Sequence, residues 1–284
     1  MSFKTILVPL SGGSEDRRCL DAAYQVAKEH GAHIIALFVE VDPQLVMTTM
    51  SATGFYFMGS YYEALERTNS QRRAEPHKTF DSWRKRHGIS VVDAMADPGD
   101  VTAELVFSSK SSARNDYALV ADLIVCPIFP NSDSTDLGSL QDALFGAGRP
   151  ILAVPTATAL TELSNCSAAI AWNGSREAAR ALTSALPLLR RARELVLLHV
   201  GAMTQGPTLT DVQTFLARHL LDTRIVDLPS EKETGEALLN AAAKERAGLL
   251  VLGAYSHSRA REFVFGGVTR DMLTRAEIPL LLSH

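Results

Sequence analysis

Short runs of apolar residues recur along the chain, and most are too short for helices and too continuous for strands with one exposed face. Such runs, bounded by turn-forming residues, are typical of strands buried on both faces of a parallel sheet. Between the runs, apolar residues spaced three or four positions apart predict amphipathic helices. After the first run, Ser14 is the expected N-cap of a helix with Leu20 and Val26 on its apolar face. The pattern therefore predicts an α/β fold with a parallel sheet covered on both faces.

The same order of elements occurs twice. In the first half we expect a helix from Val101 to about Ser109 and strands at Thr5–Leu10, His33–Val41, Ser90–Ala94, Leu123–Phe129 and Ile151–Pro155. In the second half the expected strands are Ala168–Trp172, Leu195–Val200, Thr223–Leu228, Leu249–Leu252 and Pro279–Ser283. The helices expected there are Ser175 to about Leu189, Leu209–Leu220, Gly235–Ala247 and Val268–Ala276. The segments GGSED and NGSRE follow the first strand of each half, so we predict a duplicated unit. Its two domains are placed at residues 1–157 and 165–284, with Thr156–Ser164 as linker.

The first half carries extra length at Pro43–Glu75, which is rich in methionine and aromatic residues. We favour a loop and the start of a helix lying over the core. The alternative is a flexible lid or a partner surface around Phe55–Tyr62, because methionine and tyrosine adapt to varied apolar contacts.

Composition narrows the function classes. With 284 residues and a net charge of −4, the chain is large enough for two cores and has no bulk attraction for nucleic acid. Its three cysteines, Cys19, Cys126 and Cys166, fit neither a disulfide framework nor a zinc site. The first residues form a strand pattern rather than a secretory signal, and no apolar run is long enough to span a bilayer. We therefore expect a cytoplasmic protein with no membrane or nucleic acid partner.

A candidate anion site follows the run Leu249–Leu252. Gly253 ends this run, and Gly266 and Gly267 open the helical pattern after a polar loop. Glycine lets a backbone approach a ligand closely, and the first amides of a helix lack partners within the helix, so the arrangement can hold a phosphate. The alternative is that the glycines only let the chain turn tightly into a packed helix.

At this stretch the sequence resembles the universal stress protein family. Nucleotide-binding members carry Gly, two residues, Gly, nine residues, then Gly followed by Ser or Thr. Gly253 and Gly266 fit this spacing, whereas Ser256 stands at the second glycine and Gly267 at the hydroxyl position. The resemblance covers nearly the whole chain and implies two tandem doubly wound domains with five-stranded parallel sheets in the order 3-2-1-4-5.

That order places a ligand beyond the carboxyl ends of the first and fourth strands, where the strand order reverses. Asn173 matches the family's Asp after the first strand, although it can also form a turn with Ser175 as helix cap. Arg259 is able to approach phosphate, and we expect the Thr269 hydroxyl to replace the one missing at Gly267. The expected nucleotide-binding residues are Asn173, Gly174, Ser175, Val200, Gly253, Ser256, Arg259, Gly266, Gly267 and Thr269.

The first half is a poorer candidate. Ser11 stands where the family has Asp, and Pro127 aligns with Gly253 but has no amide donor. We therefore expect one site in each chain.

The functional expectation is a stress-associated, non-catalytic regulatory protein that binds ATP or AMP, with Mg, in its second domain. No motif of a phosphate loop, dinucleotide turn, zinc protease or serine hydrolase is present, and we predict no catalytic residue. The alternatives are a nucleotide-independent interaction scaffold with an unknown protein partner, a receptor for another small ligand, or a slow ATP hydrolase. The resemblance implies that the domains pair through their last strands, Ile151–Pro155 and Pro279–Ser283, with homodimer formation left open.

Overall fold

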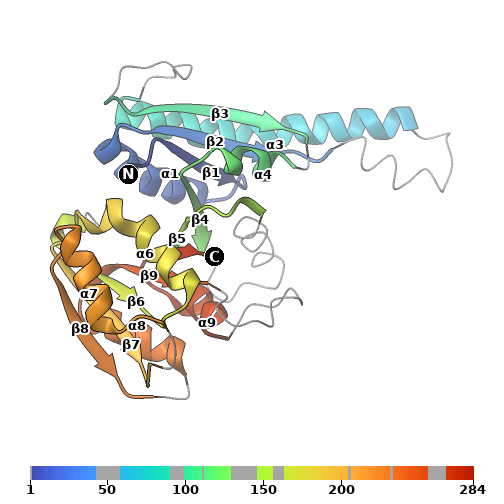
Figure 1. Cartoon of the computed structure of the whole chain (residues 1–284). Coiled ribbons are helices and arrows are strands. Elements are labelled where there is room, and N and C mark those ends of the chain that lie inside the picture. The colour runs from blue at the N-terminus through green and yellow to red at the C-terminus, as the bar shows by residue number, and fades with distance from the viewer. Residues whose placement is uncertain are drawn as a thin grey trace.

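The computed structural model describes residues 2–42, 58–89, 99–110, 112–128, 146–155, 163–203, 206–230, 233–254 and 267–284. Strands and helices alternate through them (Figure 1). The strands are β1 Thr5–Leu10, β2 His33–Val39, β3 Thr102–Ser108, β4 Leu123–Ile128, β5 Ile151–Pro155, β6 Ser167–Ala171, β7 Glu194–Val200, β8 Thr223–Leu228, β9 Ala247–Gly253 and β10 Leu280–Ser283. The helices are α1 Asp16–His30, α3 Met58–His87, α4 Ala113–Leu119, α6 Arg176–Leu189, α7 Leu209–Arg218, α8 Thr234–Lys244 and α9 Gly267–Arg275, with a short 3-10 helix at Leu163–Asn165.

The strands form one ten-stranded sheet in the order β3-β2-β1-β4-β5-β10-β9-β6-β7-β8. Each half thus has the predicted order 3-2-1-4-5, with parallel pairing inside each half. The halves join where β5 and β10 pair antiparallel, with Leu281 opposite Leu152, so the expected pairing of the last strands is confirmed. Because the strands of the two halves run in opposite directions, their carboxyl ends lie at opposite edges of the sheet.

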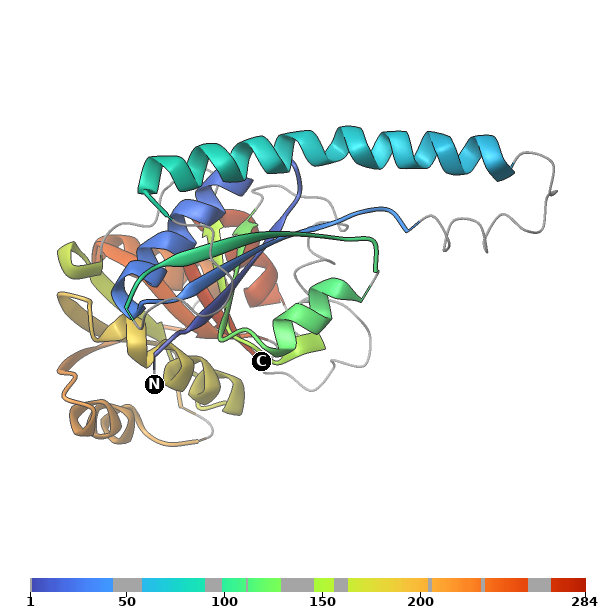
Figure 2. The ribbon, with the colours of Figure 1, turned by 90° about the horizontal axis from the view of Figure 1, so that it is seen from above.

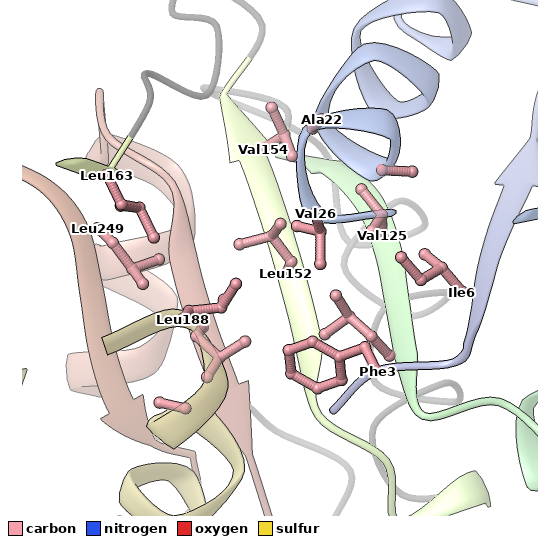
Figure 3. Packing of buried hydrophobic residues seen from close by; sticks show 14 of the residues in the cluster. Phe3, Ile6, Ala22, Val26, Val125, Leu152, Val154, Leu163, Leu188 and Leu249 are labelled. Atoms are coloured by element: carbon pink, nitrogen blue, oxygen red, sulfur yellow. The ribbon is translucent and has the colours of Figure 1, made fainter. Parts of the chain in front are cut away.

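The two halves also share a hydrophobic core. One cluster of buried side chains includes Phe3 and Val26 from the first half and Leu188 and Leu249 from the second. Figure 3 shows these side chains facing one another across β5. Since no break in the core separates the halves, the boundaries 1–157 and 165–284 stay a prediction.

The prediction of a helix from Val101 to about Ser109 is wrong, because Thr102–Ser108 forms β3 and pairs with β2 along its whole length. Val101 and Leu105 are four residues apart, as on a helix, but short apolar runs do not distinguish helix from strand. The pairing with β2 decides the matter. The strand expected at Ser90–Ala94 lies outside the described residues.

The extra length of the first half contributes a helix of 30 residues, α3. Its later part packs on α1, and Phe80 and Trp83 are buried there. Figure 2 shows its earlier part reaching beyond the ends of the strands. Residues 43–57 lie outside the described part of the chain, so the loop expected there is not tested.

Candidate functional site

The carboxyl ends of β6 and β9 lie side by side in the second half, where the strand order reverses. Ile170 and Val251 are register partners near these ends, and β7 follows on the other side of β6. The predicted loops after Trp172 and after Leu252 therefore leave the same edge of the sheet. This edge is where a doubly wound sheet binds its ligands.

The turn after β6 is held by Asn173. Its side-chain oxygen accepts hydrogen bonds from the Ser175 amide at 3.1 Å and from the Ser175 hydroxyl at 2.7 Å. Ser175 is the N-cap of α6 and accepts from the Ala178 amide at 3.1 Å. Gly174 lies between them with φ of +75°, a conformation that favours glycine. The interpretation of Asn173 and Ser175 as turn and cap is confirmed.

Gly253 has a packing role of its own. A Cβ at this position would lie 2.4 Å from the Ala178 nitrogen and 2.6 Å from the Glu177 carbonyl carbon. Both are backbone atoms, so neither can move aside without shifting α6. The end of β9 therefore approaches the first turn of α6 at a distance that only glycine allows. This contact explains Gly253 without a ligand.

Glu177 places a buried charge beside this contact. The residue is 3% exposed, and its carboxylate accepts a hydrogen bond from Arg176 Nε at 2.6 Å. Burial raises the pKa of Glu177, but the hydrogen bonds from the Arg176 side chain and the backbone outweigh burial and lower it overall. No sequence motif predicted a role for Glu177, and its signal in the sequence is an acid two residues after the helix cap Ser175.

Helix α9 supplies the other side of the edge. It begins at Gly267 and has no acidic residue in its first turn, and Thr269 there is buried with 5% exposed. Val200 ends β7 and is half-buried. The other expected ligands, Ser256, Arg259 and Gly266, lie outside the described residues. The structure thus brings Asn173, Gly174, Ser175 and Gly253 together and leaves the role of the loop before α9 a prediction.

Solved structures match this fold over nearly the whole chain. A universal stress protein from Archaeoglobus fulgidus matches 98% of this chain and 97% of its own, at 14% identity and a TM-score of 0.67. A Pseudomonas aeruginosa chain described as a candidate universal stress protein matches 99% and 93%, also at 14% identity, with a TM-score of 0.55. This chain has the tandem universal stress protein fold. No family model and no curated protein matches its sequence.

In the first half of this universal stress protein fold, a carboxylate does follow the first strand. Asp16 is buried and accepts hydrogen bonds from the Ser11 amide at 2.8 Å, the Ser11 hydroxyl at 3.0 Å and the Gly12 amide at 2.8 Å. Desolvation by burial raises the pKa of Asp16, although the hydrogen bonds from Ser11 and Gly12 oppose the shift. The prediction of Ser14 as N-cap is wrong, because Glu15 holds that position and Asp16 satisfies the preceding amides.

The turns after β1 and β6 correspond differently by backbone conformation than by sequence. Gly12 has φ of +85° and so corresponds to Gly174, whereas matching GGSED to NGSRE puts Gly13 there. Backbone conformation therefore makes Gly12, rather than Gly13, the counterpart of Gly174.

In the first half, helix α3 lies over the edge of the sheet at which β1 and β2 end. Arg73 donates to the buried Glu40 carboxylate at 2.5 and 2.7 Å, and Asn69 donates to the Val41 carbonyl at 3.0 Å. The ring of Pro76 lies 3.8 Å from the position that a Cβ on Gly12 would take. These contacts hold α3 against the carboxyl ends of β1 and β2. The expectation of one site in each chain stays a prediction.

No group of three or more His, Cys, Asp or Glu side chains able to hold a metal ion occurs among the described residues. None of the described helices has the length and apolar character needed to cross a membrane.

Proposed function

We propose that the chain is a stress-associated, non-catalytic regulatory protein that holds an adenine nucleotide, ATP or AMP with Mg, in its second half. The observation that carries the proposal is the strand order, which sets the Asn173 turn and the first turn of α9 at one edge of the sheet. The tandem universal stress protein fold supports it, together with the Gly253 and Gly266 spacing.

The chemistry of the edge favours one orientation of the ligand. The first amides of α9 and its dipole attract phosphate, and no acid in that turn opposes them. The buried carboxylate of Glu177 and the polar turn at Asn173 suit the ribose hydroxyls better than they suit phosphate. We therefore place the phosphates at α9, the ribose near Asn173 and the base toward β7.

Calorimetric titration of the purified chain with ATP and AMP, each with and without Mg, tests the proposal. We expect saturable binding at one site per chain. Gly266→Asp should abolish binding through charge repulsion, whereas Gly266→Asn, of the same shape without the charge, should retain part of it. No heat at millimolar nucleotide from a folded, nucleotide-free wild-type chain would overturn the proposal.

A second candidate is a nucleotide-independent interaction scaffold, and the shape of α3 favours it. The helix reaches past the sheet (Figure 2). From Glu63 to Glu75 nearly all of its residues are exposed. Deleting residues 55–62 should then remove protein partners recovered with the wild-type chain. Partners that persist after the deletion would count against the scaffold.

A further inference from the structure

A buried histidine lies beside the proposed site with one ring nitrogen unused. His199 is 5% exposed, near the end of β7, and its Nδ1 lies 2.7 Å from the Trp172 carbonyl oxygen. A carbonyl only accepts, so Nδ1 carries the proton and donates to it. In the neutral ring Nε2 is then a hydrogen-bond acceptor. It is buried and has no hydrogen-bond partner among the described residues.

An unused buried acceptor is costly, because the group has lost its water and gained nothing in return. The next strand adds another acceptor to the same place. Asp227 on β8 is the register partner of His199, and it lies on the same face as Ile225 because strand residues alternate. Asp227 is exposed. His199 Nε2 and the Asp227 carboxylate thus place two hydrogen-bond acceptors near the ends of β7 and β8.

The first half shows that packing alone does not require a histidine here. Phe38 on β2 has the position equivalent to His199 on β7. Phe38 is the register partner of Leu10 at the end of β1, and His199 lies beside Trp172 just after the end of β6. The Arg72 guanidinium carbon of α3 lies 5.8 Å from the Phe38 ring centroid. An apolar ring covered by α3 thus satisfies the fold where no ligand is expected. In the second half α7 has only ten residues and begins at Leu209.

The residues just before α7 contact the proposed site. A Cβ on Gly206 would lie 2.3 Å from the Gly174 carbonyl oxygen, and Pro207 accepts a hydrogen bond from the Trp172 indole at 3.3 Å. Gly201 and Gly206 both have positive φ, at +79° and +74°. Gly206 and Pro207 therefore lie against the turn that holds Asn173 and against Trp172, whose carbonyl oxygen is the partner of His199.

The strand order sets where a base would lie. With phosphates at α9 and ribose near Asn173, the base extends past β6 toward β7, and neighbouring strands are about 4.8 Å apart. We infer that His199 Nε2 accepts a hydrogen bond from the exocyclic amino group of an aminopurine, which selects adenine over hypoxanthine. This inference rests on the proposed function.

Titrations with ATP and ITP test it, because ITP carries a carbonyl where ATP carries the amino group. Wild type should bind ATP about tenfold more tightly than ITP, the effect of one good hydrogen bond. His199→Phe, which copies Phe38, should weaken ATP binding about tenfold and change ITP binding little. His219→Phe is the matched control, because His219 makes an edge-to-face contact with Phe215 at the far end of α7. It should bind both nucleotides as wild type does.

A second readout needs no variant. The ¹⁵N resonance of His199 Nε2 in wild type should shift on addition of ATP and not of ITP, because accepting a hydrogen bond changes its shielding. Equal binding of ATP and ITP by wild type, unchanged discrimination in a folded His199→Phe, or an unmoved Nε2 resonance would overturn the inference and leave the proposed function standing. Absence of binding by wild type would remove both.

Discussion

The ion pair between Glu40 and Arg73 offers a direct test of how α3 is held on the first half. Glu40 is nearly buried, with 4% of its side chain exposed, whereas the Arg73 side chain is 49% exposed. Their hydrogen bond raises the pKa of Arg73. The Arg73 guanidinium carbon also lies 5.5 Å from the Phe107 ring centroid. Replacing Arg73 by Met keeps most of the apolar contact and leaves the Glu40 carboxylate without its partner.

Breaking a buried pair costs about 3–5 kcal/mol, and exposed pairs contribute about 0–1 kcal/mol. Arg73 is half exposed, so water can partly replace it, and we expect Arg73→Met to lower the free energy of unfolding by about 2–3 kcal/mol. The matched control is Arg67→Met on the same helix. Its partner is Glu63 at 3.5 Å, and both side chains are more than 70% exposed, so the loss should stay below about 0.5 kcal/mol.

Urea unfolding of both variants gives the comparison, and hydrogen exchange along α3 shows where the loss occurs. Adding Glu40→Gln to Arg73→Met should recover part of the stability, because the buried charge is then gone. If Arg73→Met and Arg67→Met are equally stable, the pair does not hold α3 and the reasoning is refuted.

Four further outcomes follow from the described contacts. Ser175→Ala should lower the free energy of unfolding by about 1 kcal/mol through loss of the α6 cap, and no change in urea unfolding would contradict that role. Gly253→Ala should cost about 1–3 kcal/mol, since its Cβ meets backbone, and wild-type thermal stability would rule out the close contact. Burial raises the pKa of Cys126 to about 12, so iodoacetamide at pH 8 should label it at least about 100-fold more slowly in the native chain than in urea; equal rates would show an accessible thiol. Burial raises the pKa of Asp16 above its ordinary 3.8, so the folded chain binds this proton more tightly than the unfolded chain. The contribution of Asp16 to the free energy of unfolding should therefore fall as the pH rises from 3.8 through the folded pKa. The free energy of unfolding of wild type minus that of Asp16→Asn should fall over the same pH range, and a rise would contradict the raised pKa.

Continuous apolar runs determined most of the sheet from the sequence alone. Thr5–Leu10 and Ile151–Pro155 are strands with the predicted ends, because a strand buried on both faces needs apolar residues at nearly every position. Thr223–Leu228 also has the predicted ends, although it is an edge strand with Arg224 and Asp227 exposed. The cap at Ser175 was equally local, since a hydroxyl before a helix bonds to an amide three residues away. The strand order came from the family resemblance rather than from any run of residues.

Only the tertiary structure decided the features that join distant residues. Thr102–Ser108 is a strand because β2 pairs with it, and its own letters fit a helix as well. Gly253 is required by the approach of α6, some 75 positions earlier in the chain, and Glu40 finds Arg73 only when α3 crosses the strand ends. In the sequence, His199 is only one residue of a mostly apolar strand segment. Its unused nitrogen is a property of the packing, which the order of residues does not contain.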